Sequence, residues 1–252
     1  MTLAVFAFLL LALIGAFVQT VAGFALGMIL VALAAAFDLV SLPVLTATVS
    51  LLSLANVILA LRTQFDRVDW KVWRRISLGQ VPGIGVGLYL MMQLHSSALA
   101  FLQFLLGLFV LFGSLSMMRP NALLEKPSSG TAQFVAGLSG GLCGGLFSAS
   151  GPVMGWFFYR QPWQLEPIRA TLLACFGVTT AARTVLVFGR GEMDSEIILL
   201  TALSMPMIFL GTWLGGRWAG RVSIEFLRRW VFRLLVVMGC VIIARASFAL
   251  LN

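Results

Sequence analysis

GGLCGGLFSASGP, from Gly140 to Pro152, lies in the middle of an apolar run that extends from Ala132 to Phe158. Ser148–Pro152 interrupt this run, and neither arm reaches the roughly 20 residues that a helix needs to span a bilayer. Lipid cannot bond to the backbone groups that such a break exposes, so the break must face protein or a water-filled cavity. The sequence therefore predicts a broken helical hairpin inside a membrane.

A second break of this kind lies near the N-terminus, where Gln19–Gly23 divides the apolar stretch Leu3–Phe37. An offset of about 122–124 residues aligns the two halves of the chain at glycines and prolines, residues with strong backbone preferences. We therefore expect two repeats, residues 1–124 and 125–252, in one integrated membrane domain. The matched pairs are Gly15 with Gly137, Gly23 with Gly145, Pro82 with Pro206, and Gly87 with Gly211.

The composition excludes a water-soluble protein. Of the 252 residues, 60% are apolar and 10% are charged, and the mean hydropathy is +1.02. Soluble domains average about 45–50% apolar and about 25% charged residues. The apolar runs are also too long for the alternating strands of a β-barrel. We expect an all-α polytopic membrane protein with helices near Leu3–Val18, Gly23–Phe37, Pro43–Leu61, Val72–Met92, Ala98–Met118, Ala132–Phe147, Pro152–Phe158, Pro167–Phe188, Ile197–Leu214 and Ile224–Leu251.

The net charge of +8 orients the chain in the membrane and does not indicate nucleic-acid binding, because most basic residues lie between apolar runs. If each broken stretch crossed the membrane once, the two sides would carry eight and seven basic residues. If each is a hairpin that returns to its own side, the count becomes 14 against one, Arg190. The positive-inside rule favours the hairpins. Each half is then a broken-helix hairpin plus three transmembrane helices, and the halves form inverted repeats, as in many secondary transporters.

The two breaks also predict a binding site. The first turn of a helix carries about half a positive charge and free N–H groups, which together bind anions. Helices that begin at Gly23–Phe24 and at Gly151–Pro152 would aim these groups at a common pocket, where nearby side chains can cap the helices or contact the anion. The candidate contacts are Gln19, Thr20, Gly23, Phe24, Ser148, Ser150, Gly151 and Pro152.

Three polar residues inside apolar runs are candidates for the transport pathway. Asn56 and Thr179 occupy matching repeat positions, and each either faces the cavity or hydrogen-bonds between helices. Arg183 either lines an anion path, snorkels to the membrane surface, or pairs with an acid in the loop Glu192–Glu196. Glycines spaced four apart are expected to serve helix packing, namely Gly79, Gly83, Gly87, Gly137, Gly141 and Gly145.

The residue types of catalytic and metal sites are missing from the interiors of the apolar runs. All nine carboxylates lie at loops or at run ends, and the only histidine, His95, lies in a loop. Cys143, Cys175 and Cys240 show neither metal-ligand nor disulfide spacing. We expect a protein that is not an enzyme, with no catalytic residue, no metal and no cofactor. The predicted partners are a small anionic substrate and the lipid bilayer, and the oligomeric state stays open.

GGLCGGLFSASGP, with the apolar run that follows to Tyr159, resembles the second-half signature of the TauE/SafE sulfite-exporter family. GAFVQTVAGFALG, from Gly15 to Gly27, resembles the first-half signature. The resemblance covers almost the whole chain. It implies a multi-pass inner-membrane permease for small sulfur-containing or organic anions such as sulfite, sulfoacetate or related sulfonates.

One main hypothesis follows, with alternatives. The protein is expected to be a secondary transporter that exports sulfite or organosulfonates by alternating access, with the substrate at the two opposed broken-helix N-termini. The alternatives are a passive anion channel, an importer of an organic carboxylate or sulfonate, and a non-transporting scaffold or enzyme subunit. The anion, the direction of transport and any coupling ion stay open at this point.

Overall fold

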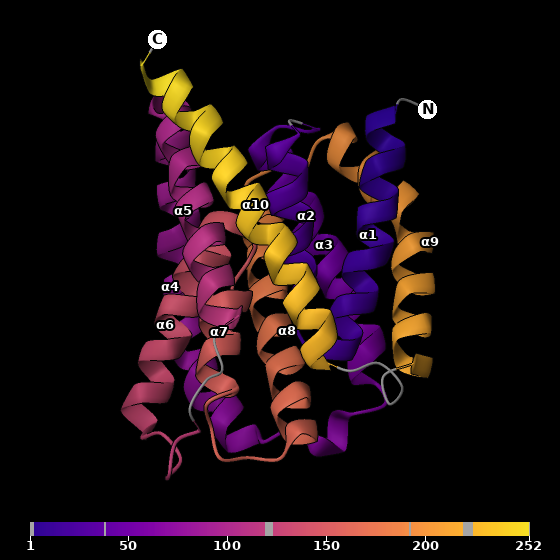
Figure 1. Cartoon of the computed structure of the whole chain (residues 1–252), viewed down its shortest axis with the longest axis vertical. Coiled ribbons are helices and arrows are strands. Elements are labelled where there is room, and N and C mark those ends of the chain that lie inside the picture. The colour runs from indigo at the N-terminus through magenta and orange to yellow at the C-terminus, as the bar shows by residue number, and fades with distance from the viewer. Residues whose placement is uncertain (1–2, 38, 119–122, 192, 219–223, 252) are drawn as a thin grey trace.

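The computed structural model describes residues 3–37, 39–118, 123–191, 193–218 and 224–251. Asp38, Arg119, Glu192 and Arg221, two of the nine carboxylates and two of the counted basic residues, lie outside these ranges. Within them the chain forms ten α-helices and the short 3₁₀ helix η1 (Figure 1). Their bounds are α1 Leu3–Ala22, α2 Leu26–Ala36, α3 Leu42–Leu61, η1 Phe65–Arg67, α4 Trp70–Ser97, α5 Leu99–Met118, α6 Gly130–Phe147, α7 Gly151–Phe158, α8 Leu165–Gly189, α9 Ser195–Trp218 and α10 Ile224–Leu251.

Each predicted apolar run corresponds to one of these helices, and the described residues include no strand. Within the described part of the chain, six helices are long and apolar enough to cross a membrane by length and composition, namely α1, α3, α5, α8, α9 and α10. α4, predicted as a span at Val72–Met92, has 28 residues but is less apolar, because it also contains charged and polar residues such as Arg74, Arg75 and Gln80. The prediction of an all-α polytopic membrane protein is confirmed.

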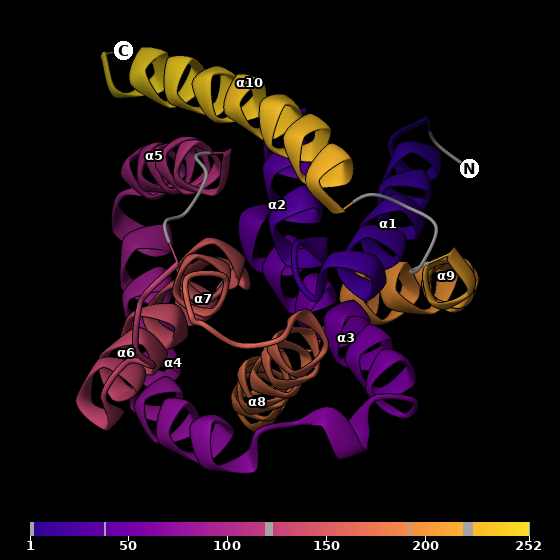
Figure 2. The same ribbon diagram turned by 60° about the horizontal axis from the view of Figure 1, so that its bottom comes forward.

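α1 and α2 form one helical hairpin, and α6 and α7 form another (Figure 1). α7 returns to the side on which α6 begins, because Gln161 after α7 bonds to Ser128 before α6. The Gln161 side chain accepts from the Ser128 backbone N–H at 2.9 Å and donates to its hydroxyl at 3.0 Å. Figure 2 shows the two hairpins facing each other near the centre of the molecule, with α3 and α8 beside them and α10 across one side.

The first break begins later than predicted. Gln19–Ala22 were expected to belong to the break, but α1 continues through them. The side chains of Gln19 and Thr20 find hydrogen-bond partners within the protein, so the helix does not have to open at these residues. The chain leaves the helix at Gly23, with φ of 78°, and reaches Ala25, with φ of 105°. Positive φ costs glycine little. α2 therefore starts at Leu26 rather than at Gly23.

The second break lies where the sequence predicts it. α6 ends at Phe147, Ser148 adopts a left-handed conformation with φ of 54°, and α7 begins at Gly151. The backbone N–H of Ser148 still bonds to the carbonyl of Gly144 at 2.9 Å, which closes the last turn of α6. Pro152 stands in the first turn of α7, where its missing N–H leaves no helical bond unmade.

Glycine seams hold α4 against α6 and α9 against α1. A Cβ added at Gly79, Gly83 or Gly87 would lie under 3.0 Å from a backbone carbonyl oxygen of α6. On the other seam, a Cβ at Gly211 would lie equally close to the carbonyl oxygen of Leu13. The expected packing role of the spaced glycines is confirmed for Gly79, Gly83, Gly87, Gly137, Gly141 and Gly145.

Gly83→Ala is expected to destabilise the protein by about 1–3 kcal/mol, the usual cost of overpacking a core. The new Cβ would meet the Leu138 carbonyl oxygen and the Leu142 backbone N, and neither atom can rotate away. Gly85 lies two residues further along α4, and a Cβ there meets nothing within 4 Å, so Gly85→Ala is the matched control. Thermal unfolding in detergent should show a lower Tm for Gly83→Ala only; equal Tm values would contradict the tight seam.

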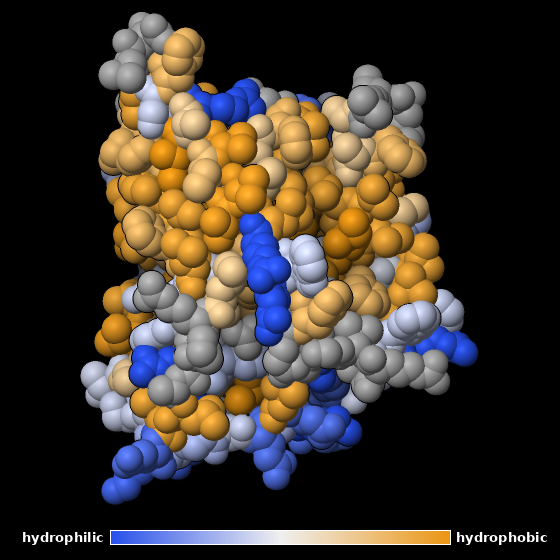
Figure 3. Space-filling model, in the orientation of Figure 1, coloured by the Kyte–Doolittle hydropathy of each residue, from blue (hydrophilic) through white to orange (hydrophobic). Residues whose placement is uncertain are grey.

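Polar and apolar surfaces separate along the long axis of the molecule. On the face drawn in Figure 3, hydrophobic residues form a broad band above, and hydrophilic residues gather at the lower end. α3, α7 and α9 end, and α4, α6 and α8 begin, at this lower end (Figure 1). The basic residues that the charge argument placed on one side therefore share one end of the bundle in the described structure, among them Arg62, Arg67, Lys71, Arg74, Arg75, Lys126, Arg160, Arg169 and Arg217.

Candidate functional site

The two broken-helix hairpins meet directly at their breaks. A Cβ on Gly27, in the first turn of α2, would lie under 3.0 Å from the carbonyl oxygen of Ser148 in the second break. The hydroxyl of Ser148 lies 2.6 Å from that of Ser50 on α3. Ser50 donates its own proton to the carbonyl of Thr46, at 2.8 Å, so Ser148 is the donor between the two hydroxyls. The start of α2 is thus in backbone contact with the chain that leads into α7.

A small closed cavity lies at this junction. Its volume is about 10 Å³, which is room for about one water molecule. The wall combines both breaks with polar residues of α3 and α8. The lining residues are Gln19, Gly27, Met28, Ser53, Ser148, Ala149, Ser150, Gly151, Phe176, Thr179 and Thr180.

Four of the eight predicted contact residues line this cavity, and the other four lie elsewhere. Thr20 lines a separate recess between α1, α3 and α9. Gly23 packs against the backbone of Arg169: a Cβ built on Gly23 would lie 3.3 Å from the Cα of Arg169. Phe24 is buried between the rings of Tyr159 and Phe232, with centroids at 5.7 and 5.8 Å. Pro152 packs on Gly113 of α5. These four residues build the junction but do not line the cavity.

An amide network joins the first break to α3 and α9. The side-chain oxygen of Gln19 accepts from the backbone N–H of Leu26, at 3.2 Å, and so caps the start of α2. The Gln19 amide nitrogen donates to Asn56 at 2.9 Å. Asn56 donates in turn to the hydroxyls of Thr20 at 3.1 Å and Thr212 at 2.7 Å. Of the two roles left open for Asn56, bonding between helices is the one this network shows.

The second break has hydroxyl and amide groups with bonding capacity left. Thr179 lines the cavity and also accepts from Gln80 of α4 at 2.8 Å, so it fills both roles proposed for it. The hydroxyl of Ser150 and the amide oxygen of Gln80 have no hydrogen-bond partner among the described residues, although both side chains are buried. Ser150 does not cap α7 through its side chain. Its hydroxyl is therefore available to a bound molecule.

Gln80 bonds to a residue of the cavity wall and was not among the predicted site residues. It is fully buried and bonds to α8 at both the Thr179 hydroxyl and the Cys175 carbonyl. A polar residue inside the glycine-rich run of α4 was the available signal, because an amide has no role in a glycine seam that packs through backbone contacts.

Arg183 is buried rather than snorkelling, so that alternative is wrong. Its side chain is 1% exposed and donates to the carbonyls of Gly144 and Gly145, in the last turn of α6, and to the Thr46 hydroxyl at 2.7 Å. Its guanidinium also lies 3.3 Å from the Met91 sulfur. The reason is local: α6 stops in mid-bundle, so the Gly145 carbonyl in its last turn needs a donor from outside the helix, and the Gly144 carbonyl accepts a second bond beside the one from Ser148.

Arginines also cap two further carboxyl ends near the hairpins. Arg169 donates to the carbonyl of Val21 at the end of α1, beside the Tyr159 hydroxyl, which donates to Ala22 at 2.6 Å. Arg245 of α10 donates to the carbonyl of Ala36 at the end of α2, at 2.8 Å. The negative ends of α1, α2 and α6 are thus each met by a cation.

This arrangement gives the hairpin junction a positive bias. At each break the negative end of one helix lies close to the positive end of the next, and the two would otherwise oppose each other. Because Arg169 and Arg183 compensate the negative ends, the amino ends of α2 and α7 dominate at the cavity. Helix amino ends with free N–H groups are a common means of binding anions without a Lys or Arg side chain. Among the described residues, no group of three His, Cys, Asp or Glu side chains gathers to hold a metal.

The sequence is similar to a known protein family and to two named relatives. The family model "Sulfite exporter TauE/SafE" matches residues 7–242. The chain is 36% identical over 226 residues to the "Probable sulfite/organosulfonate exporter TauE" of Cupriavidus necator, which covers 89% of this chain and 88% of that protein. It is 26% identical over 176 residues to the "Probable inner membrane transporter protein TsaS" of Comamonas testosteroni, covering 69% of this chain and 72% of that one. No protein of known structure gives a significant match.

Proposed function

The chain belongs to the sulfite exporter TauE/SafE family, and on this basis we propose that it exports a small sulfur-containing oxyanion, sulfite or an organosulfonate. The family consists of membrane transporters, so the protein is a multi-pass inner-membrane transporter and not an enzyme. The junction of the two hairpins is the proposed substrate site. The observation that carries this proposal is the closed cavity between two helix breaks whose opposing negative ends are capped by arginine.

The proposed contacts come from both breaks and from α8. Ser150 offers a hydroxyl with no partner among the described residues, and Gly151 lets the anion approach the first turn of α7. The hydroxyls of Ser148 and Thr179 now donate to Ser50 and to the Cys175 carbonyl, so each would have to turn to donate to the anion. Gln19 would release the start of α2 if an anion took its place, because its amide oxygen is the group that now caps that helix. Sulfonates and sulfite present the oxygen acceptors that such donors bind.

Transport is proposed to proceed by alternating access between two inverted repeats, residues 1–124 and 125–252. The helix pairing supports this symmetry: α1 packs on α9 as α6 packs on α4, α3 packs on α8, and α5 on α10. α3–α8 and α5–α10 join corresponding helices of the two halves, whereas α1–α9 and α6–α4 are equivalent pairs that the repeat exchanges. The cavity is too small for sulfite in its closed form, so passage requires the halves to move. A pore that stays open is disfavoured for the same reason.

Counterflow in proteoliposomes tests the proposed function. Vesicles preloaded with unlabelled sulfite should accumulate labelled sulfite transiently above its outside concentration, because a carrier exchanges one anion for another. An organosulfonate and an organic carboxylate serve as alternative substrates in parallel. Transport without accumulation would indicate a channel, a preference for the carboxylate would replace the substrate class, and no sulfite-dependent flux in any arm would overturn the proposal.

The basic end of the bundle is proposed to face the cytoplasm. Single cysteines at Arg67, in η1, and at Arg217, near the end of α9, are expected to react with an impermeant thiol reagent from the same, cytoplasmic side. Gly189→Cys near the end of α8, where a Cβ meets nothing within 4 Å, should react only from the other side. If Arg67→Cys and Arg217→Cys react from opposite sides, the hairpin of α6 and α7 crosses the membrane and the topology fails.

A further inference from the structure

A wide recess opens at the basic end of the bundle, next to the closed cavity. It lies between α1, α3 and α9 and has a volume of about 580 Å³. Thr20 and Thr212 form its buried part, whereas Gly216 and Arg217 are exposed at its edge. An organosulfonate, which the closed cavity cannot hold, has ample room here.

The side chain of Asn56 connects the lining of the recess to the lining of the cavity through hydrogen bonds. Gln19 lines the cavity and donates to the Asn56 oxygen. On the other side, the Asn56 nitrogen donates to Thr20 and Thr212, which both line the recess. Asn56 itself is fully buried. The Asn56 amide therefore bonds to residues that line the cavity and to residues that line the recess. These bonds connect α3 to α1 and α9, the helices that would have to separate to join the two spaces.

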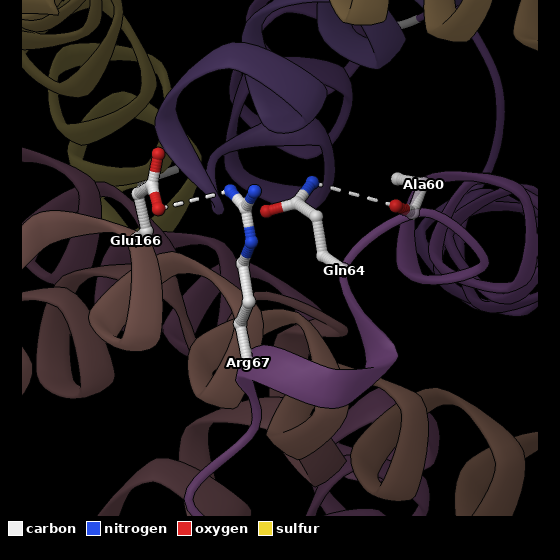
Figure 4. Close-up of polar contacts among 4 residues, drawn as sticks. All are labelled: Ala60, Gln64, Arg67 and Glu166. Atoms are coloured by element: carbon white, nitrogen blue, oxygen red, sulfur yellow. Dashed lines mark hydrogen bonds and ion pairs between the residues drawn. The ribbon is translucent and has the colours of Figure 1, made fainter.

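The chemistry of the recess suits an anion. Arg217 is charged, its guanidinium lies 5.5 Å from the Trp213 ring centroid, and none of the described lining residues is acidic. At the rim, the amide of Gln64 bonds to the Ala60 carbonyl only at 3.4 Å (Figure 4). The neighbouring Glu166 is occupied by an ion pair with Arg67 at 3.0 Å.

We propose that this recess is the cytoplasmic docking vestibule for the transported oxyanion and that Asn56 is the gate between it and the central cavity. The inference rests on the proposed anion transport and assigns its entry route. Arg217 attracts the anion to the vestibule, and the Asn56 bonds to Gln19, Thr20 and Thr212 hold the passage shut. Loss of these bonds opens the cavity to the cytoplasm.

Thiol labelling tests the gate without relying on transport. In a chain whose three native cysteines are replaced by alanine, Ser53→Cys reports on the cavity and Gly216→Cys on the recess. Inside-out vesicles are treated with the anionic reagent sulfonatoethyl methanethiosulfonate. Gly216→Cys should react quickly in either background. Ser53→Cys should react slowly with Asn56 present and at least about tenfold faster with Asn56→Ala, since each lost hydrogen bond favours opening by roughly fivefold.

Equal rates at Ser53→Cys with Asn56 and with Asn56→Ala would overturn the gate. Thr180→Cys is a second cavity reporter from α8 and is used if Ser53→Cys fails to fold. A separate labelling measurement tests the docking role of Arg217. Arg217→Gln should slow the anionic reagent at Gly216→Cys by about threefold, the effect of one charge roughly 6 Å away in water.

The cationic reagent trimethylammonioethyl methanethiosulfonate is the control for charge. Arg217→Gln should not slow it, and an equal slowing of both reagents would overturn the docking role. The labelling experiment and the sulfite counterflow experiment test different proposals and can give different outcomes. Gated labelling without sulfite flux would leave the vestibule in place and reject the substrate, whereas sulfite flux with ungated labelling would reject this inference alone.

Discussion

Gly151→Leu is expected to abolish anion transport while the protein still folds and reaches the membrane. Gly151 begins α7 and lines the cavity of about 10 Å³. A Cβ here meets only the ring of Phe24, at 3.5 Å, and the Ala25 nitrogen, at 3.9 Å, so the first added carbon fits. The rest of a leucine side chain exceeds the cavity and occupies the place of the oxyanion. Uptake of labelled sulfite by proteoliposomes measures the loss.

Gly151→Ala is the matched control, because its single methyl group makes ordinary van der Waals contact. It should keep most of the transport rate. Ser150→Leu, at the neighbouring cavity residue, should repeat the loss seen with Gly151→Leu. The Tm in detergent and the elution profile of each variant separate blocked transport from misfolding. A folded Gly151→Leu protein that transports at the wild-type rate would remove the cavity from the transport path.

The helix content and the second break were predictable because both depend on local sequence. Ser148–Gly151 combine small, polar and flexible residues of low helix propensity inside an apolar run, and this composition favours the end of a helix there. The first break was placed about a turn too early, because Gln19 and Thr20 look like interruptions in a one-dimensional pattern. In three dimensions Gln19 bonds to Asn56 and Leu26, so the helix continues through it.

The details of the site depend on contacts between distant helices, which periodicity does not report. Gln80 meets Thr179 across 99 residues, and Asn56 meets Thr212 across 156. Arg183 was recognised as unusual, but its partner, the carboxyl end of α6, could only be identified once α6 was seen to stop beside α8. A buried cation in an apolar run is therefore a signal of a nearby helix end as much as of a ligand.

Arg183→Met is expected to raise the KM for sulfite by about tenfold or more. The cation compensates the carboxyl end of α6, and Thr179 and Thr180 of the cavity wall lie one turn away on the same helix. A unit charge roughly 10 Å from an anion, at an effective dielectric constant of about 20, contributes about 1.7 kcal/mol. Its removal leaves the negative helix end next to the amino end of α7, so the junction binds anions more weakly. Initial rates of uptake against sulfite concentration give KM and the maximal rate separately.

Arg183→Lys separates charge from hydrogen-bond geometry. Lysine keeps the positive charge but loses the fork that reaches both α6 carbonyls and Thr46, so its KM should lie between wild type and Arg183→Met. Arg190→Gln, at the exposed end after α8, is the control for a surface charge. It should change KM little at physiological salt, because exposed charges are screened within about 8 Å. If Arg183→Met folds and its KM equals that of wild type, the positive bias at the junction does not come from capped helix ends.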